Sequence, residues 1–437
     1  MKGSTASDMT NHSVSAPGPW SILLTGSLSQ QTLQTVETIA DSIATLSPDE
    51  QDPSLAGGQA GLALLYAWLA RTRGSARAEE RAWRCLDRAI DAVATQEMES
   101  SLWHGFVGVA WAAEILQRLL DPQGEDRNEA VDDVVSRLLM RHDLWRAPHD
   151  LVDGVTGLGV YALERHPRPL AVECLRYIVE RLEASAQHDD RGIYWWTPAT
   201  ELSPDDREEH PSGLVDLGVA HGVPGAIAVL GAICGIGVES PRAHQLLEGA
   251  VSWLRAQAVT TDTGPTYPYS VAPGAEPEPA RSAWCYGDPG VAAALLVAAR
   301  GAQQPAWERA AVELACRAAG RPPAETGIID AGFCHGTAGL AHLYNRMYQA
   351  TGEGKLGHAA RYWLERTLQF CRLAQSRGGL WVKGTEDPSE GGWTDLDLMT
   401  GAAGIALVLL AATTSLEPLW DRMFLASSPR SSLLHAL

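Results

Sequence analysis

A glycine pair of the form Gly-x-x-Gly recurs seven times along the chain, each time at the start of a strongly apolar segment. The distances between successive first glycines are 47, 49, 68, 65, 49 and 65 residues. A period near 47 residues accommodates two helices and their two connections, and such periods are typical of repeat proteins. The longer distances therefore indicate inserted loops. The pairs are Gly58/Gly61, Gly105/Gly108, Gly154/Gly157, Gly222/Gly225, Gly287/Gly290, Gly336/Gly339 and Gly401/Gly404.

Two kinds of segment alternate around these pairs, and both have helical character. Those after the glycines are apolar on nearly every face: 62–70, 109–120, 158–165, 226–236, 291–300, 340–350 and 405–413. Those between them carry charges on one face: 31–44, 76–95, 128–140, 169–186, 241–256, 305–319 and 355–373. A helix that is apolar all round is buried, whereas one with a charged face lies outside. The sequence therefore predicts an all-α protein, an α/α toroid with seven inner and seven outer helices.

The composition narrows the class of protein. A net charge of −19 argues against nucleic acid and anionic membrane surfaces as partners, because these require basic faces. No apolar run approaches 18 residues, and no secretion signal is visible at the N-terminus. Seven cysteines, an odd number, do not suggest a disulfide framework and favour a reducing cytoplasm. Residues 1–18 are small, polar and unpatterned, so we expect a disordered tail before a single domain spanning 19–437.

The residues directly before the first glycines are polar in six of the seven repeats: Gly57, His104, Asp153, His221, Tyr286, His335 and Thr400. In a closed ring all seven turns converge at one end of the barrel. Seven helix N-termini, each with free N–H groups and partial positive charge, meet there as well. Such an end favours anions, including thiolates, enolates and carboxylates.

Two of these turns carry soft-metal ligands. Cys285, Cys334 and His335 could bind one Zn²⁺ with the fourth position open, which is the pattern of catalytic zinc sites. The two cysteines lie 49 residues apart, which is one repeat and makes their turns neighbours in the ring. The alternative is a chance Cys-His pair, since no local zinc-finger spacing supports the site. The other five cysteines are expected to be small buried apolar residues.

Four further residues near the turns have side chains suited to acid–base work: Asp150, His221, Arg281 and Tyr286. His221 titrates near neutrality and suits proton transfer to a carbanion, with Asp150 holding it in place. Asp150 could instead be only a capping carboxylate. We expect capping or structural roles for Asp216, Asp395 and Asp397, and surface or loop positions for the remaining histidines, His149 and His342 among them.

At these residues the chain resembles the lanthipeptide cyclase family, the LanC-type proteins. The most specific pieces of the resemblance are Trp284-Cys285-Tyr286-Gly287, Cys334-His335-Gly336 and Ala220-His221-Gly222, in this family's order. The likeness extends to Gly404 and so covers nearly the whole chain. Some members carry an extra small domain between early helices, for which the spacings of 47 and 49 leave little room.

The resemblance implies an α/α toroid with one Zn²⁺ on Cys285, Cys334 and His335, and acid–base or positioning roles for Asp150, His221, Arg281 and Tyr286. The implied reaction is a Michael-type addition of cysteine thiols to dehydroalanine or dehydrobutyrine in a dehydrated precursor peptide, which forms thioether rings. The chain resembles the stand-alone cyclases. The implied location is the cytoplasm, and the sequence leaves open docking to a separate dehydratase or export transporter, through which the protein would be peripheral to the membrane.

Three other functions remain open. A zinc α/α-barrel transferase related to protein prenyltransferases would use the same thiolate activation but needs a basic diphosphate pocket, and this end of the barrel offers mainly Arg281. A non-catalytic relative that binds peptide or glutathione would act as an adaptor. An α/α-barrel glycosidase needs two catalytic carboxylates, and no pair of turns offers a convincing pair.

Overall fold

The computed structural model of the chain describes residues 20–46, 52–141, 149–262, 264–376 and 395–427. The predicted tail, residues 1–18, lies outside the described residues, so the assignment of 19–437 to a single domain stays a prediction. None of the helices among the described residues has the length and apolarity needed to cross a bilayer.

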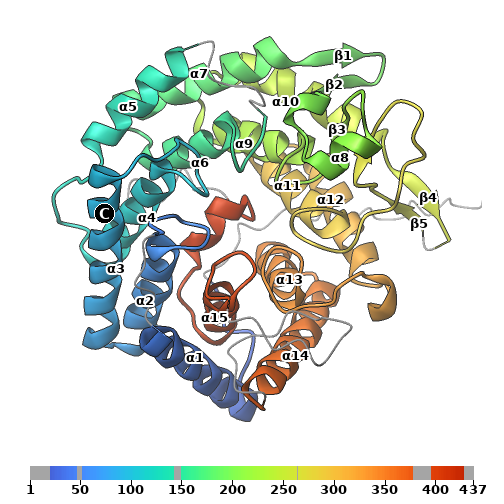
Figure 1. Cartoon of the computed structure of the whole chain (residues 1–437). Coiled ribbons are helices and arrows are strands. Elements are labelled where there is room, and N and C mark those ends of the chain that lie inside the picture. The colour runs from blue at the N-terminus through green and yellow to red at the C-terminus, as the bar shows by residue number, and fades with distance from the viewer. Residues whose placement is uncertain (1–19, 47–51, 142–148, 263, 377–394, 428–437) are drawn as a thin grey trace, which may run out of the picture.

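Seven apolar helices form the inner ring, and the prediction of a toroid is confirmed (Figure 1). Each helix contacts the next one around the ring, and α15 contacts α2, which closes it. Their middle residues are buried on every face, as an all-round apolar sequence requires. The helices are α2 (Gln59–Arg73), α4 (Phe106–Leu120), α6 (Val155–Arg165), α9 (Val223–Ile236), α11 (Asp288–Gly301), α13 (Thr337–Thr351) and α15 (Ala402–Thr413).

The amphipathic helices surround this ring and bury only one stripe each. In α3, for example, Ala78, Ala82, Leu86 and Ala89 are buried at helical spacing while the other face carries charges. The burial of this stripe against the inner helix, rather than helix propensity, is what stabilises each outer helix. The outer helices are α1 (Gly26–Leu46), α3 (Ala76–Thr95), α5 (Glu129–Met140), α7 (Pro169–Ser185), α10 (Ser240–Arg255), α12 (Pro305–Ala318) and α14 (Gly354–Ser376).

Backbone hydrogen bonds tie the turns to one another around the ring. The bond that joins the last turn to the first runs from the Leu398 N–H to the Ala56 carbonyl, at 2.9 Å. That bond links residues more than 300 positions apart. Together with the contacts between α15 and α2, it closes the ring. Further bonds of this kind are Ala56 N to Trp103 O, Leu151 N to Ala220 O, Val219 N to Cys285 O, Cys285 N to Cys334 O, and Cys334 N to Met399 O.

The glycine pairs lie at the helix starts, which the sequence analysis had placed about three residues too late. The first glycine is the N-cap and the second lies inside the first helical turn, as Gly336 and Gly339 do in α13. A Cβ on Gly339 would collide with the carbonyl oxygen of Phe333, six residues earlier, and one on Gly108 with that of Leu102. The turn folds back tightly onto the helix start, so only glycine fits there.

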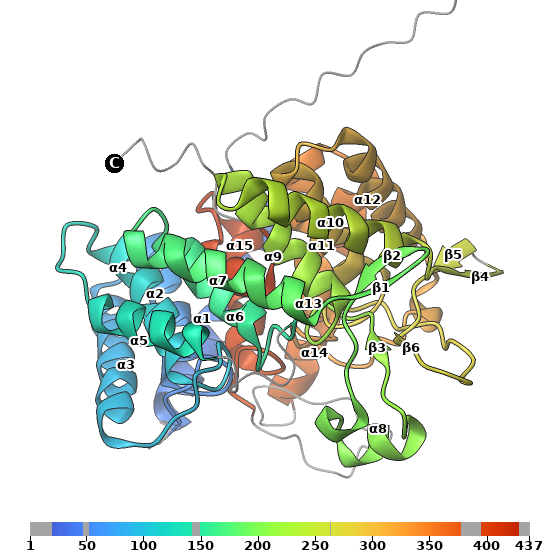
Figure 2. The same cartoon turned by 90° about the horizontal axis from the view of Figure 1, so that it is seen from above.

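The long connections before the fourth and fifth turns form small inserted structures. The first holds β1 (Gln187–Asp189), β2 (Gly192–Tyr194), the 3-10 helix η1 (Ala199–Glu201), α8 (Pro204–Glu209) and β3 (Val215–Asp216). The second holds β4 (Val259–Thr261), β5 (Gly264–Thr266) and β6 (Ser270–Val271). Antiparallel pairs join β1 to β2, β4 to β5, and β3 to β6, so the last pair connects the two insertions. α8 projects from the ring beside them (Figure 2). The third long connection, between α14 and α15, includes residues 377–394, which lie outside the described part. The 3-10 helix η2 (Pro323–Glu325) lies in the connection before the sixth turn.

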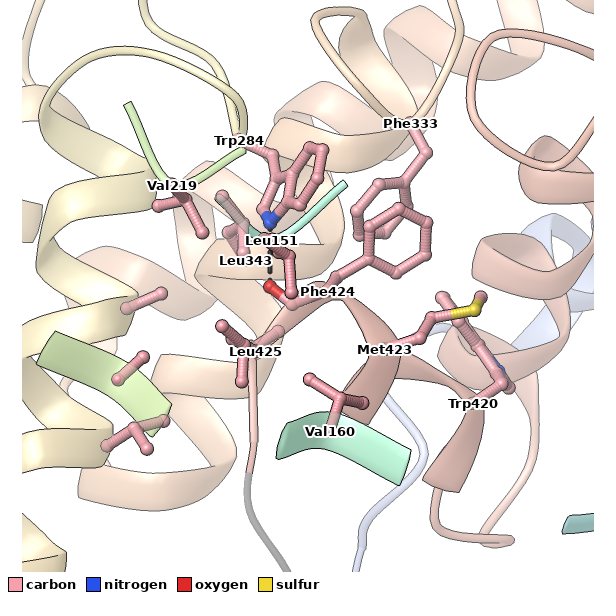
Figure 3. Packing of buried hydrophobic residues seen from close by; sticks show 14 of the residues in the cluster. Leu151, Val160, Val219, Trp284, Phe333, Leu343, Trp420, Met423, Phe424 and Leu425 are labelled. Atoms are coloured by element: carbon pink, nitrogen blue, oxygen red, sulfur yellow. Dashed lines mark hydrogen bonds between the residues drawn. The ribbon is translucent and has the colours of Figure 1, made fainter. Parts of the chain in front are cut away.

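Residues after α15 fill the centre of the ring, which the sequence analysis did not predict. The 3-10 helix η3 (Leu419–Phe424) lies among the inner helices (Figure 1). Figure 3 shows the Phe424 ring packed against Phe333, with Trp284 nearby, and the Trp284 indole N–H donates to the Phe424 carbonyl at 2.7 Å. The barrel therefore has an aromatic core directly below the turns that carry Cys285 and Cys334.

Candidate metal centre and catalytic site

The turns at the N-terminal ends of the inner helices expose one ring of residues. In all seven repeats the residue directly before the first glycine is exposed or half-exposed, while every first glycine is buried. The Gly-x-x-Gly geometry therefore places one exposed or half-exposed position per repeat at this end, and all of these positions except Gly57 carry a side chain. We call this ring of seven positions, defined by Gly57, His104, Asp153, His221, Tyr286, His335 and Thr400, the mouth.

Three soft-metal donors meet at the mouth. One ligand atom each from Cys285, Cys334 and His335 lies within 4.8 Å of the others. Neighbouring turns bring them together, because the Cys285 N–H donates to the Cys334 carbonyl at 3.3 Å. The buried carboxylate of Asp330 lies 3.3 Å from Nε2 of His335, and its other oxygen accepts from the Gly332 N–H. Asp330 was not predicted as a site residue, although it lies only five positions before His335.

The electrostatics of this cluster favour a thiolate. A hydrogen bond from the Cys334 thiol, the neighbouring His335 and the charge of Arg281 lower the pKa of the Cys285 thiol, against its burial. The hydrogen bond to Asp330, followed by that to Cys285, raises the pKa of His335 to about 9. Two sulfurs and one imidazole are the ligands that zinc selects, and a carboxylate behind the histidine is the usual partner of a ligating imidazole. The residues present fit Zn²⁺.

A histidine–carboxylate pair lies at the third and fourth turns. Nδ1 of His221 is 2.8 Å from Oδ2 of Asp150, and the His221 side chain is 44% exposed. Burial disfavours the charged imidazole, but the hydrogen bond to Asp150 and the charges of Asp150 and Asp216 outweigh it and raise the pKa of His221 to about 9. His221 is therefore protonated at neutral pH. The other oxygen of Asp150 accepts from the Val152 and Asp153 N–H groups, so Asp150 also caps its turn.

A second pair, Tyr286 and Asp216, lies beside the first. The Tyr286 hydroxyl donates to Oδ2 of Asp216 at 2.8 Å, while Oδ1 accepts from the Gly218 N–H at 2.7 Å. Burial raises the pKa of Asp216 to about 6 and, with the charge of Asp216, raises that of Tyr286. A capping or structural role was expected for Asp216, and the contacts give it both, since it accepts from the Gly218 N–H and fixes the direction of the Tyr286 hydroxyl.

Arg281 reaches the same region from the second insertion. Its Nε donates to the Tyr269 hydroxyl at 3.2 Å, and the rings of Tyr269 and Tyr286 lie 5.4 Å apart. Among the described residues no carboxylate forms an ion pair with Arg281, so its terminal nitrogens keep their capacity for an anion. Two aromatic residues of the inserted connections have different surroundings. Tyr269 lies near the mouth, whereas Trp195 is buried against α7.

The seventh turn carries two carboxylates with a local role. Oδ1 of Asp397 accepts from the Thr400 and Gly401 N–H groups, and the Thr400 hydroxyl donates to both Asp395 and Asp397. Burial and the charge of Asp395 raise the pKa of Asp397 to about 6. These contacts agree with the capping roles expected for both residues.

One family model and several solved structures match the chain. The family model described as "Lanthionine synthetase C-like protein" matches residues 49–425, which is most of the chain. A solved structure titled "Nisin cyclase" has a TM-score of 0.74 with this chain at 18% sequence identity, covering 91% of this chain and 98% of the other. At this identity the structural match shows a shared fold. None of the curated protein sequences compared with the chain matches it.

Proposed function

Because the chain belongs to the lanthionine synthetase C-like family, we propose that it is a zinc-dependent cyclase acting on a dehydrated precursor peptide. In the reaction a cysteine thiol of the peptide adds to a dehydroalanine or dehydrobutyrine of the same peptide, which gives lanthionine or methyllanthionine. The observation that carries the proposal is the convergence of Cys285, Cys334 and His335 at the mouth, within 4.8 Å. The imidazole of His221 and the guanidinium of Arg281 supply the positive charges that the addition requires.

The metal site would consist of Cys285, Cys334 and His335, with Asp330 orienting the imidazole. The contact between Asp330 and Nε2 leaves the other ring nitrogen of His335 for the metal. When bound, Zn²⁺ would lower the pKa of a substrate thiol so that it reacts as a thiolate at neutral pH. The low pKa of Cys285 supplies one thiolate ligand at neutral pH, whereas Cys334 and His335, whose pKa values are raised, would release their protons when the metal binds.

His221 is the proposed proton donor. When the substrate sulfur bonds to the β-carbon, the electron pair of the double bond moves toward the neighbouring carbonyl and forms an enolate. The α-carbon then needs one proton, which the protonated His221 can deliver directly or through one water. Since Nδ1 faces Asp150, Nε2 is the nitrogen left for the substrate, and Asp150 fixes the ring in that orientation.

Arg281 and Tyr286 complete the proposed site. The terminal nitrogens of Arg281 suit the enolate oxygen, whose charge the convergent helix N-termini also stabilise. The hydroxyl proton of Tyr286 is already donated to Asp216, so its oxygen faces the substrate as an acceptor. That acceptor can hold a peptide N–H, which makes Tyr286 a positioning residue more than a proton donor.

Free thiols test the proposal. Incubating the zinc-loaded protein with a dehydrated peptide that contains cysteine should lower the number of free thiols faster than the uncatalysed reaction, with no change in peptide mass. Thiols that disappear only at the spontaneous rate, for several peptides that bind the protein, would support the adaptor function instead. A Cys316→Ala variant is the matched control, because this half-buried cysteine lies outside the mouth.

A further inference from the structure

A pocket of about 240 Å³ lies outside the mouth, between β5, the end of α12 and the start of α14. Its lining includes three basic side chains and one acidic side chain, together with Thr266 and Gly320: Arg317, Arg321, Lys355 and Asp288. The chain as a whole has only 34 basic residues against 53 acidic ones. Three of the basic residues around one cavity therefore require an explanation.

Arg321 forms the fixed wall of this pocket. One of its terminal nitrogens donates to the Ser282 hydroxyl at 3.0 Å, and the other donates to the Thr266 hydroxyl at 2.8 Å and to Asp288 at 3.2 Å. The Arg321 side chain is only 11% exposed and that of Asp288 only 2%. Asp288 is further satisfied by the Tyr267 N–H, at 2.9 Å. The single acidic group of the pocket is thus already neutralised by Arg321.

The other two cations have no such partner. Within the described ranges neither Arg317 nor Lys355 forms an ion pair, and both are exposed. The Lys355 ammonium lies 3.0 Å from the place where a Cβ on Gly320 would stand, so the absence of a side chain at Gly320 lets the amine sit against the pocket wall. The Glu353 carboxylate nearby accepts from the backbone N–H of Lys355 at 3.2 Å. The three basic side chains and one acidic side chain of the lining therefore leave it with a net charge of about +2.

We propose that this pocket binds an oxyanion carrying two negative charges, of the phosphate or dicarboxylate class. Arg317 offers a planar fork for two oxygens and Lys355 a mobile point charge, which is a pairing suited to such a group. Arg321 holds its place with its hydrogen bonds to protein groups and so preforms the wall that the anion meets. The same residue links the pocket to the segment that contains Arg281, through Ser282.

Titration calorimetry on the full chain, with inorganic phosphate and succinate as probes at constant ionic strength, tests the site. Saturable binding of one equivalent is expected, and the tighter of the two probes identifies a phosphoryl or a carboxylate ligand. Replacing Arg317 by Ala or Lys355 by Ala should each weaken that binding by about tenfold or more, because each removes a charge-assisted hydrogen bond. Arg309→Ala, which removes an exposed charge from the same helix outside the pocket, should leave it unchanged.

The proposal is overturned by three results. They are the absence of saturable binding of either probe, equal binding by the Arg317→Ala variant and the unaltered protein, and equal weakening by Arg309→Ala.

Discussion

Two histidine–aspartate pairs in this molecule have the same separation between nitrogen and oxygen and opposite electrostatics. His221 and Asp150 at the mouth, and His342 and Asp421 in the centre of the barrel, are each 2.8 Å apart. The pKa of His221 is raised to about 9, whereas burial lowers that of His342 below its ordinary value. The His221 side chain is 44% exposed and that of His342 is 0% exposed. A close carboxylate therefore does not by itself give a charged histidine.

The neighbours of each pair explain the difference. Asp421 also accepts from Nε of Arg346 at 2.7 Å, so the arginine already compensates the charge of Asp421. Nδ1 of His342 has no hydrogen-bond partner, and its ring packs against Trp20 and Trp420. A neutral ring suits these surroundings. His221 has no competing arginine on Asp150 among the described residues and lies near a second carboxylate, Asp216. The barrel pair is structural, and the mouth pair is suited to proton transfer.

Removing the mouth imidazole should give the largest effect. In the His221→Ala variant we expect ring formation to slow by about 10²- to 10⁴-fold, because positioned proton transfer contributes that much to a rate. The unfolding midpoint should also fall at neutral pH, because the raised pKa of His221 means that its charged ring stabilises the fold, so the rate is compared at a temperature where both proteins are folded. Single-turnover loss of peptide thiols measures the rate. His104→Ala, at the same position of the second repeat, is the control and should keep full activity; an equal loss there would remove the special role of His221.

Breaking the barrel pair should act on stability. Asp421→Asn leaves Arg346 buried with only part of its compensation, and one broken buried ion pair typically costs about 3–5 kcal/mol of unfolding free energy. Urea denaturation measures this change, and Asp190→Asn on the exposed surface is the control. A variant that unfolds at the same urea concentration as the unaltered protein would contradict the structural role given to Asp421.

The ring could be predicted from the sequence because its apolar segments recur at a regular spacing. Contacts made by residues outside this repeat could not be predicted. Seven apolar segments at repeat spacing could only be buried together, and one repeat between Cys285 and Cys334 placed their turns side by side. His342 was expected at the surface or in a loop, which is wrong, because it is buried within the inner helix α13. Its partner Asp421 is 79 residues away in a segment with no periodicity, so the pair could not be seen in the sequence. The link from Asp216 to Tyr286 joins two neighbouring turns, as the link from Asp150 to His221 does, but the sequence offered Asp216 only as a capping or structural carboxylate.

Neutralising Asp150 should convert the mouth pair into an ordinary histidine. In Asp150→Asn the amide oxygen can still accept from the Val152 and Asp153 N–H groups, but the pKa of His221 should fall from about 9 toward 6.5. The active form is protonated, so the alkaline limit of the rate should move to lower pH. The charged His221 also contributes to the free energy of unfolding. This contribution is fully present below about pH 6.5 and is lost as pH rises through about 9, the folded-state pKa.

Ring-proton NMR of the histidines measures both pairs in one titration. His221 should titrate near pH 9 in the unaltered protein, while His342 should stay neutral down to a pH below its ordinary range. An unchanged titration of His221 in Asp150→Asn would contradict the cause given for its raised pKa.

The smallest effect is expected at Asp216. In Asp216→Asn the carbonyl oxygen can still accept from the Gly218 N–H, but the amide cannot accept from the Tyr286 hydroxyl in the same way. We expect a loss of about tenfold in kcat/KM, the size of one hydrogen bond to a charged group. If Asp216 acts only through Tyr286, the Tyr286→Phe variant should show no further loss when combined with it. Additive losses would assign Asp216 a separate role.

The central claim is that Cys285, Cys334 and His335 together hold one zinc ion at the mouth of the ring. The most direct test is the zinc content of the purified protein, measured for the unaltered chain, Cys285→Ala and the control Cys316→Ala. We predict one zinc per chain in the unaltered protein and the control, and a large loss of zinc together with ring-forming activity in Cys285→Ala. A Cys285→Ala protein that retained stoichiometric zinc and full activity would contradict the account.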